Sequence, residues 1–546
     1  MRLVLRLALS ALSAVLMVLS VPTFDWWPLM WIGLLPALHV ALTAATPRRA
    51  FFQGWFTGIL ANTAAFYWMK GLLERFGHMP GIEAIPIMML LTTYQGLEFG
   101  LWSWLVHRLA RRRPSLPMAW AAPLVMVAIE LLVPQIFPFY LAISQAWVPH
   151  VIQIADLTGP MGVTFMLVMV TGALYDAWRA VEAARASAPG AVALRAALPA
   201  LRLPAALVAL VLLYGVVRIH QIDARRAAAP KARVGIVQAN IGISEKWDPN
   251  ERGRLLRLHQ ELSSQLSREG TDLIVWPESS YPYAVNRSMS ADYPPGDPRR
   301  IRGPNETTPT IFGAVTLDMG PRVGKARYPW NTALMMDESG RLVGKFDKVF
   351  LLIFGEYIPF YDSIPWFTEL FPEASNFNRG DSPGSFPFHL DGHDYRLGPL
   401  ICYEDILPGF TRRTAALDPN LLVNITNDAW FGKTFEPYQH LALAVFRSVE
   451  NRLEMVRSVN TGVSAHIDAV GRVRASLGAQ DPASEPPPEP MKMRVEAALL
   501  DRGGLYAAIG DLFAWGCTLA LAALLFGMPG RLRKVTPRVR RRRSRS

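Results

Sequence analysis

The sequence predicts a bundle of about eight membrane-spanning α-helices joined to a soluble α/β domain. Three observations support this prediction. The 546-residue chain is 51% hydrophobic and only 18% charged, below the ~25% that is usual for soluble proteins. Its apolar residues gather in stretches of about 20, the helix length that crosses a bilayer core. One long polar segment, residues 231–500, instead alternates short β-rich runs with helical runs, which favours a layered α/β fold.

Apolar stretches mark out the membrane part. Seven lie in residues 1–220, and an eighth lies in residues 505–528. The expected spans run near residues 3–21, 27–45, 51–72, 82–106, 117–137, 159–177, 199–217 and 506–528. The first stretch has the basic start of a signal peptide. Because its apolar part is long and leads directly into another span, we expect a retained helix.

The distribution of Lys and Arg predicts the orientation of these spans. With a cytoplasmic N-terminus, the cytoplasmic segments hold twenty-one basic residues, nine of them in the tail at 529–546, whereas the short opposite loops hold only Lys70 and Arg75. We therefore expect residues 231–500 outside the cytoplasm and both termini inside. Without the nine tail residues the net charge of +12 falls to +3. This distribution favours a role in membrane topology or lipid contact over nucleic-acid binding.

Two carboxylates, Glu98 and Glu130, fall inside expected spans. A carboxylate at membrane depth must face protein or a water-filled cavity. It then serves a substrate or proton path, or it is a hydrogen-bonded packing residue. We favour packing, because no glycine-interrupted helix repeat of the transporter kind occurs.

Residues 231–500 are long enough for one large core. The expected strands are Arg233–Gln238, Leu273–Trp276, Thr310–Val315, Thr332–Met336, Leu397–Cys402, Leu421–Ile425, Ser464–Asp468 and a last one at 494–500. Helices are expected near 250–267 and 438–455. Continuous apolar runs within the strands indicate a sheet that is covered on both faces.

Three chemically active side chains follow strand-like runs. Glu278 lies in Trp276–Ser279, Lys348 in Gly344–Phe350, and Cys402 at the end of Leu397–Cys402. Strand ends meet at one edge of an α/β sheet, so we expect residues 70 and 54 positions apart to meet in space. The second cysteine, Cys517, lies in an apolar run, so the chain is not a disulfide scaffold.

The order Glu, Lys, Cys resembles the catalytic triad of the nitrilase superfamily, and the resemblance covers most of residues 231–500. With the motif Asn427–Gly432 after the next strand, and with the eight-span frame, the whole chain resembles the apolipoprotein N-acyltransferase family of Gram-negative bacteria. The resemblance implies an αββα sandwich. It also implies a multi-pass protein of the bacterial inner membrane with its catalytic domain on the periplasmic side.

The family resemblance further implies transfer of an acyl chain from a phospholipid to the amino group of a lipoprotein's N-terminal diacylglyceryl-cysteine. In that reaction Glu278 would be the general base, Lys348 the cationic stabiliser and Cys402 the nucleophile. Other matches to the family's pocket and substrate path are Glu356, Tyr403, Glu404 and Trp247. No cofactor is implied. A His-Glu-x-x-His motif is absent, so we expect no zinc site, and we expect a monomer.

The residues support this chemistry without the family. A thiolate is the reactive form of cysteine, and a free thiol is only a few per cent ionised at neutral pH. A carboxylate with an ordinary pKa is a poor base for a thiol. We therefore expect burial and a second carboxylate, Glu356, to raise the pKa of Glu278. Lys348 would offset the charge of the thiolate and of the tetrahedral oxyanion. A thioester intermediate predicts ping-pong kinetics.

Other interpretations remain open. A membrane-tethered carbon–nitrogen amidohydrolase would use the same triad, with water in place of the amine. A scaffold with an inactive domain is a third class. A Cys-His protease could use His389, His393, His440 or His466, but no papain-like signature surrounds Cys402. The aromatic segment 357–377 is a candidate lid over acyl chains, and an ordinary packed loop is the alternative.

Overall fold

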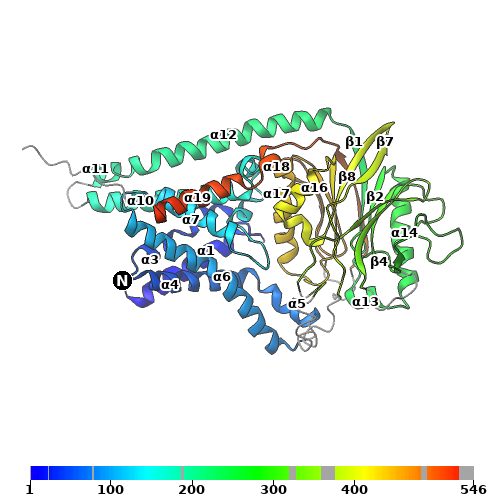
Figure 1. The fold of residues 1–546 in the computed structure, drawn as a ribbon, viewed down its shortest axis with the longest axis horizontal. Coiled ribbons are helices and arrows are strands. Elements are labelled where there is room, and N and C mark those ends of the chain that lie inside the picture. The colour runs from blue at the N-terminus through cyan, green and yellow to red at the C-terminus, as the bar shows by residue number, and fades with distance from the viewer. Residues whose placement is uncertain are drawn as a thin grey trace, which may run out of the picture.

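The structure is a computed structural model that describes residues 2–22, 24–76, 79–185, 190–318, 328–353, 355–357, 376–480 and 488–527. A bundle of helices forms one end of the molecule, and two β-sheets with flanking helices form the other (Figure 1). Nearly all of the candidate lid at 357–377 lies outside the described residues, as does the basic tail.

The bundle is built from helices of very unequal length. Its longer helices are α1 (Leu3–Ser20), α4 (Pro47–Ala65), α5 (Trp68–Phe76), α6 (Gly81–Arg112), α7 (Met118–Leu132), α10 (Pro160–Ala184), α12 (Leu198–Ala228) and α19 (Leu512–Phe526). Its short helices are η1 (Trp27–Leu29), α2 (Met30–Gly33), α3 (Leu35–Leu42), η2 (Leu141–Gln145), α8 (Pro149–Ile152), α9 (Ala155–Thr158), α11 (Gly190–Arg195) and α18 (Leu505–Ile509).

Three of the described helices are long and apolar enough to cross a membrane, namely α1, α10 and α12. The other expected spans coincide with helices that are shorter, divided or more polar. The second expected span, for example, is divided into η1, α2 and α3. Length and composition alone therefore support three of the eight expected spans.

The first helix, α1, packs inside the bundle. The Ser13 hydroxyl accepts a hydrogen bond from the backbone N–H of Ala37 at 2.9 Å, and the Arg6 guanidinium donates to Gln53 at 2.9 Å. Nearby, α4 and α6 approach each other closely at glycines. A Cβ on Gly58 would lie 2.4 Å from the carbonyl oxygen of Gly96. Small residues of this kind let membrane helices pack backbone to backbone.

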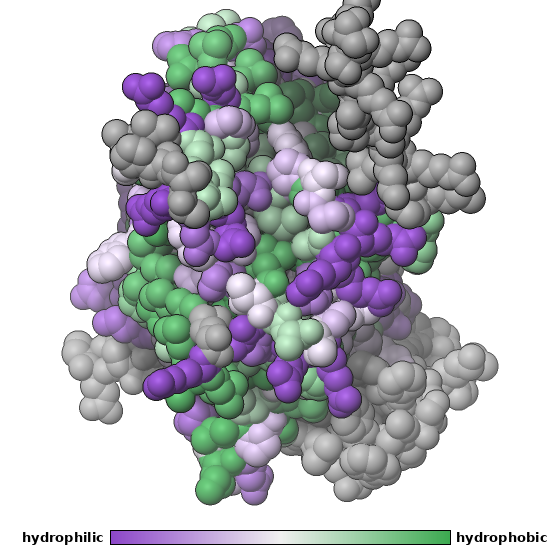
Figure 2. All heavy atoms as spheres, turned by 90° about the vertical axis from the view of Figure 1, so that its left-hand side faces the viewer, coloured by the Kyte–Doolittle hydropathy of each residue, from purple (hydrophilic) through white to green (hydrophobic). Residues whose placement is uncertain are grey.

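Two long helices connect the ends of the molecule. The helix α12 begins at the end farthest from the sheets and leads into β1, and α19 returns from the sheets toward that far end (Figure 1). Arg113, after α6, donates to the carbonyls of Leu524 and Gly527 at the end of α19. Figure 2 looks onto this far end and shows hydrophilic side chains spread across it among apolar ones.

Two mixed sheets form the soluble domain. The first has the order β13-β1-β2-β4-β5-β6, with β3 paired to β4, and the second has the order β12-β11-β10-β9-β8-β7. The first sheet contains β1 (Lys231–Gln238), β2 (Leu273–Val275), β3 (Val285–Asn286), β4 (Thr310–Leu317), β5 (Trp330–Met336), β6 (Leu342–Asp347) and β13 (Met491–Ala498). The second contains β7 (Phe386–Leu390), β8 (His393–Ile401), β9 (Leu421–Thr426), β10 (Met455–Val459), β11 (Ser464–Ile467) and β12 (Val473–Leu477).

The sheets stack face to face between helices. The Ser458 hydroxyl in β10 lies within hydrogen-bonding distance of the carbonyls of Val237 (2.8 Å) and Val275 (3.0 Å) in the opposite sheet. The helix α14 (Arg252–Arg268) covers the outer face of the first sheet, and α16 (Pro408–Ala415) and α17 (Glu436–Asn451) cover that of the second (Figure 1). Two shorter helices, α13 (Ile243–Trp247) and η3 (Cys402–Ile406), follow strands. The predicted αββα sandwich is therefore present.

Eight of the thirteen strands that the structure describes are predicted. All eight expected strands exist, but β3, β6, β7, β10 and β12 were not predicted. The predicted helix 438–455 overruns the real one, which ends at Asn451 because Arg452 adopts a left-handed conformation with φ of 54°. The strand β10 begins soon afterwards, so its first residue was wrongly assigned to a helix.

A buried ionic cluster joins the bundle to the soluble domain. Asp156 in α9 accepts hydrogen bonds from Tyr214 (2.5 Å) and Arg218 (2.8 Å) of α12. It also accepts one from Arg452 after α17, at 2.9 Å, and the side chains of Asp156 and Arg452 are fully buried. A buried arginine that loses its carboxylate partner is strongly destabilising.

We expect Asp156→Ala to leave Arg452 uncompensated and to destabilise the protein by about 3–5 kcal/mol. The measurement is the apparent melting temperature of the full-length protein in detergent. The matched control is Asp223→Ala, because Asp223 pairs with Arg472 in a part-exposed position where a pair contributes only about 0–1 kcal/mol. An equal loss of melting temperature in both variants would contradict the assignment of Asp156 to the buried ionic cluster that joins the bundle to the domain.

Candidate active site

Glu278 and Lys348 meet at one rim of the first sheet. Glu278 follows β2, and Lys348 directly follows β6. The Nζ atom of Lys348 lies 3.2 Å from Oε1 of Glu278 and 2.8 Å from Oε2 of Glu356. Lys348 is only 1% exposed. A fully buried lysine requires compensating charge, and two carboxylates provide it here. Lys348 is therefore not a solvated surface lysine.

Asn331, which the sequence analysis did not single out, connects the two carboxylates. Its Nδ2 atom lies 2.7 Å from Oε1 of Glu278 and 2.7 Å from Oε1 of Glu356. An amide nitrogen has two hydrogens, so it can donate to both. Glu356 also accepts a hydrogen bond from the backbone N–H of Leu352 at 2.9 Å. The only signal in the sequence was a polar residue at the start of an apolar strand.

Cys402 approaches this group from the second sheet. It follows β8 as the first residue of η3, with φ of 50°, a left-handed conformation that is uncommon for residues other than glycine. Its thiol interacts electrostatically with Glu278 and Lys348. The three predicted residues therefore gather, but the expectation of one sheet edge is wrong. Because the sheets stack, ends of β2, β6 and β8 share one rim.

The pKa of Glu278 differs from the value that the sequence analysis predicts. Burial alone raises the pKa of Glu278, but the ammonium of Lys348 and the amide of Asn331 more than offset it, so its pKa lies below the ordinary value. The predicted increase is therefore wrong for the resting site. Burial and the Glu278 carboxylate hold the pKa of the Cys402 thiol well above its usual range. The resting pair is an ionised glutamate and a neutral thiol.

Glu404 fixes the two sides of the site to each other. Its carboxylate accepts hydrogen bonds from the backbone N–H groups of Val349 (2.6 Å), Phe350 (3.1 Å) and Ile401 (2.9 Å). These donors come just after Lys348 and just before Cys402. Glu404 is fully buried. It acts through the backbone of both segments and is a positioning residue.

Tyr403 and Trp247, the other two supporting residues, differ in placement. Tyr403 lines the cavity beside Cys402, and its hydroxyl donates to the carbonyl of Ile136 at 3.0 Å. Trp247 is 54% exposed and lies outside that cavity lining. Its neighbour Lys246 is buried instead, with Nζ 2.9 Å from the carbonyl oxygen of Glu278. Burial lowers the pKa of Lys246 to about 8.

A buried network supports the helical turn that carries Cys402. Asp405 in η3 forms an ion pair with Arg457 and lies 2.7 Å from Nε2 of His440. The Nδ1 atom of His440 lies 3.4 Å from Asp428. Burial lowers the pKa of His440, but nearby carboxylates, Asp428 first, more than offset this and raise it. Both ring nitrogens face carboxylates, so His440 does not form the Cys-His dyad of a protease.

Asp428, His440 and Glu436 also bring metal-ligand atoms within 4.8 Å of one another. Asp428 and Glu436 each lie within ion-pair distance of His440, which accounts for this spacing.

A cavity of about 50 Å³ lies against Cys402. The bundle contributes Phe66, Trp68, Phe137 and Phe139 to its wall, and the domain contributes Tyr403 and Phe431, the latter from the predicted motif Asn427–Gly432. The space is sufficient for only a few water molecules. An acyl chain therefore enters only if these aromatic side chains move apart. Cys402 therefore faces the junction between the helical bundle and the α/β domain.

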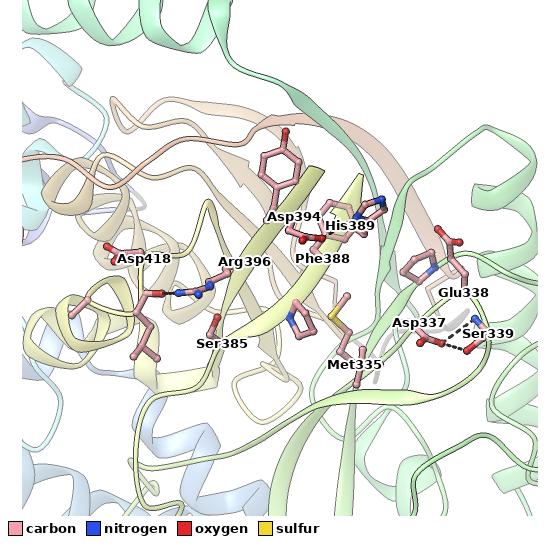
Figure 3. A pocket seen from close by; sticks show the side chains of 16 residues that line it. Met335, Asp337, Glu338, Ser339, Ser385, Phe388, His389, Asp394, Arg396 and Asp418 are labelled. Carbon is pink, nitrogen blue, oxygen red and sulfur yellow. Dashed lines mark hydrogen bonds and ion pairs between the residues drawn. The ribbon is translucent and has the colours of Figure 1, made fainter. Parts of the chain in front are cut away.

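A wide surface groove of about 1090 Å³ lies elsewhere. It is lined by Met335 and Asp337 at the far end of β5, and by His389 and Asp394 near the turn between β7 and β8 (Figure 3). The triad gathers at the opposite ends of these strands, near Asn331 and after Ile401. The groove is therefore separate from Glu278, Lys348 and Cys402, none of which lines it.

Two family models match separate parts of the chain. The family model for the apolipoprotein N-acyltransferase N-terminal domain matches residues 13–173, and that for carbon-nitrogen hydrolase matches residues 233–482. An amidase of the nitrilase superfamily from Nesterenkonia has 22% sequence identity to this chain. It covers 50% of this chain and 93% of its own, with a TM-score of 0.34.

Curated relatives match most of the chain. The apolipoprotein N-acyltransferase of Geobacter metallireducens is 32% identical over 527 residues, 94% of each chain. That of Bdellovibrio bacteriovorus is 29% identical over 85% of this chain and 84% of its own. That of Azotobacter vinelandii is 32% identical over 86% of each. With both domain families in the same order, the chain belongs to the apolipoprotein N-acyltransferase family.

Proposed function

We propose that the protein transfers an acyl chain from a membrane phospholipid to the amino group of the N-terminal diacylglyceryl-cysteine of a lipoprotein. Membership of the acyltransferase family supports this reaction. The observation that carries it is the position of Cys402, which faces an aromatic cavity built jointly by the bundle and the soluble domain. A hydrolase of small soluble amides has no need of a nucleophile at such a junction.

In the first half-reaction Glu278 accepts the proton of the Cys402 thiol, and the thiolate attacks the ester carbonyl of the phospholipid. The tetrahedral oxyanion forms near the Lys348 ammonium, which stabilises it. The intermediate collapses to a thioester on Cys402. The departing lysophospholipid alkoxide takes the proton from Glu278, so no charge is left uncompensated.

In the second half-reaction the lipoprotein amine attacks the thioester. Glu278 accepts the proton that the amine loses and returns it to the departing thiolate. Thioesters react readily with amines, and an ester is exchanged for an amide, so the transfer is downhill and needs no cofactor. Because the lysophospholipid leaves before the amine enters, the kinetics are ping-pong.

The second carboxylate has a distinct role in this scheme. When Glu278 takes the thiol proton, it can no longer balance the ammonium of Lys348. Glu356, at 2.8 Å, continues to do so. The proton moves from Cys402 to Glu278 within one group of charges, and the net charge of the buried site does not change. This constancy lowers the cost of forming a thiolate in a desolvated site.

We propose about eight membrane spans in the bacterial inner membrane, formed by α1, η1–α3, α4, α6, α7, α10, α12 and α19. Residues 1–220 and 505–528 make up the bundle, 231–500 the periplasmic catalytic domain, and 529–546 a cytoplasmic tail. Lys and Arg lie mainly in the segments assigned to the cytoplasm. The start of α1 and the start of α12 both lie at the end away from the sheets (Figure 1). We propose a monomer as the active unit.

Membranes given phospholipid with a radiolabelled acyl chain should carry label on Cys402, and a diacylglyceryl peptide should then receive it. Cys402→Ala should abolish labelling and lower transfer by at least about 10³-fold. Cys517→Ala, which removes the other cysteine, should change neither. Label that appears only as free fatty acid would show a hydrolase, and normal transfer by Cys402→Ala would remove Cys402 from the mechanism.

Glu278→Gln should make the Cys402 thiol more reactive while it abolishes transfer. The Glu278 charge helps to raise the pKa of that thiol, so its removal lowers this pKa and increases the thiolate fraction at neutral pH. Alkylation by iodoacetamide should accelerate on the order of tenfold, and its half-maximal pH should fall. The rate is measured by mass spectrometry in a Cys517→Ser background.

Lys348→Met should have the opposite effect on alkylation. The ammonium of Lys348 lowers the pKa of the thiol, so its loss leaves less thiolate at neutral pH and slows iodoacetamide. Transfer should fall about 10²–10³-fold, the usual cost of one lost oxyanion stabiliser. The same direction of change in Glu278→Gln and Lys348→Met would contradict the proposed charge arrangement.

A further inference from the structure

A loop from the bundle forms part of the wall facing the nucleophile. Residues 133–140, here called the cavity loop, connect α7 to η2. Phe137, Pro138 and Phe139 of this loop line the same cavity as Cys402. An acyl chain that extends from Cys402 into this cavity contacts the loop.

The cavity loop is hydrogen-bonded to the turn that carries the nucleophile. Tyr403, next to Cys402, donates to the carbonyl of Ile136 at 3.0 Å. In return the Tyr140 hydroxyl donates to the carbonyl of Ile406, the last residue of η3, at 3.2 Å. The loop is thus fixed to both ends of the segment Cys402–Ile406.

On its other side the loop is held by polar side chains of the bundle. The Gln135 amide donates to Glu98 at 2.7 Å, and its oxygen accepts from the backbone N–H of Phe139 at 2.9 Å. Gln95 accepts from the backbone N–H of Phe137 at 3.0 Å. Glu130 accepts from the backbone N–H of Leu141, directly after the loop, at 2.9 Å.

These contacts explain two carboxylates in expected spans. Non-helical backbone near membrane depth is tolerated only where its polar groups find partners in the protein. Glu130 satisfies such a group directly, and Glu98 does so through Gln135. Glu98 is buried. Its hydrogen bond goes to Gln135 of the loop, and that of Glu130 goes to Leu141, directly after the loop. Their contacts favour a structural role near the site over a substrate or proton path.

We propose that Glu98 and Glu130 are positioning residues that hold Phe137 and Phe139 against the acyl chain on Cys402, and thereby set the acyl-chain preference of the enzyme. This inference rests on the proposed function, because the acyl chain occupies the cavity only if Cys402 forms a thioester. The specificity of a domain outside the membrane is then set partly by residues within the bundle.

The test is a competition between acyl donors. Full-length enzyme in vesicles receives equal amounts of phosphatidylethanolamine with short and with long saturated chains, and mass spectrometry measures the ratio of the two thioesters on Cys402. Phe137→Ala and Phe139→Ala should shift this ratio toward the longer chain by at least about fourfold, the factor that one buried methylene contributes.

Glu98→Leu and Glu130→Leu should shift the same ratio by a similar factor, because they release the loop. Glu98→Gln and Glu130→Gln keep an acceptor oxygen and should restore the wild-type ratio. Gln135→Leu, a substitution at a half-buried loop position, should shift the ratio without a large loss of thermal stability. The control is Glu83→Leu, since Glu83 is exposed at the start of α6.

Distinct outcomes separate this inference from the proposed function. A wild-type enzyme without any thioester on Cys402 would overturn the proposed function itself. Normal thioester formation with an unchanged chain ratio in Gln135→Leu and Glu130→Leu would overturn only the role of the loop. Loss of turnover in Glu130→Gln would also overturn it, because a proton path requires the ionisable group and an anchor does not.

Discussion

The active site depends on one buried ammonium between two carboxylates. Lys348 contacts Glu278 and Glu356 at 3.2 Å and 2.8 Å, and none of these charges is tolerable at such depth without the others. The ammonium keeps Glu278 ionised, while that carboxylate keeps the Cys402 thiol neutral. Glu278 and Cys402 are thus the carboxylate and the thiol that we propose exchange a proton during catalysis.

Buried hydrogen bonds and ion pairs hold Lys348 and Cys402 in position. Glu404 joins the backbone after Lys348 to the backbone before Cys402. Beneath them, Asp405 ties the same turn to His440 and Arg457. The cavity loop at 133–140 then connects the turn to the membrane helices. The candidate active site and the bundle are thus linked by a short series of hydrogen bonds, and the cavity beside Cys402 is lined by residues of both.

Sequence reasoning worked where a residue's chemistry is visible locally. It identified the eight main strands, whose apolar runs are buried, and it found Glu278, Lys348 and Cys402 from the residue types that follow those runs. It missed β12, which has no buried residue, and the short β7. It also missed the fully buried β10, because the predicted helix at 438–455 extends into that strand. It also missed Asn331 and Lys246, since a single amide or lysine gives no sign of its partners until the chain has folded.

The order of residues along the chain was enough to predict a glutamate, a lysine and a cysteine as candidate catalytic groups, and a long apolar half beside them. The distances and charges around those groups depend on the folded chain. Folding brought Glu278 and Cys402 together from two facing sheets rather than one, and it lowered the pKa of Glu278 where isolated burial would raise it. The reason is that desolvation and charge interactions depend on distances between residues far apart in the chain, which no local pattern encodes.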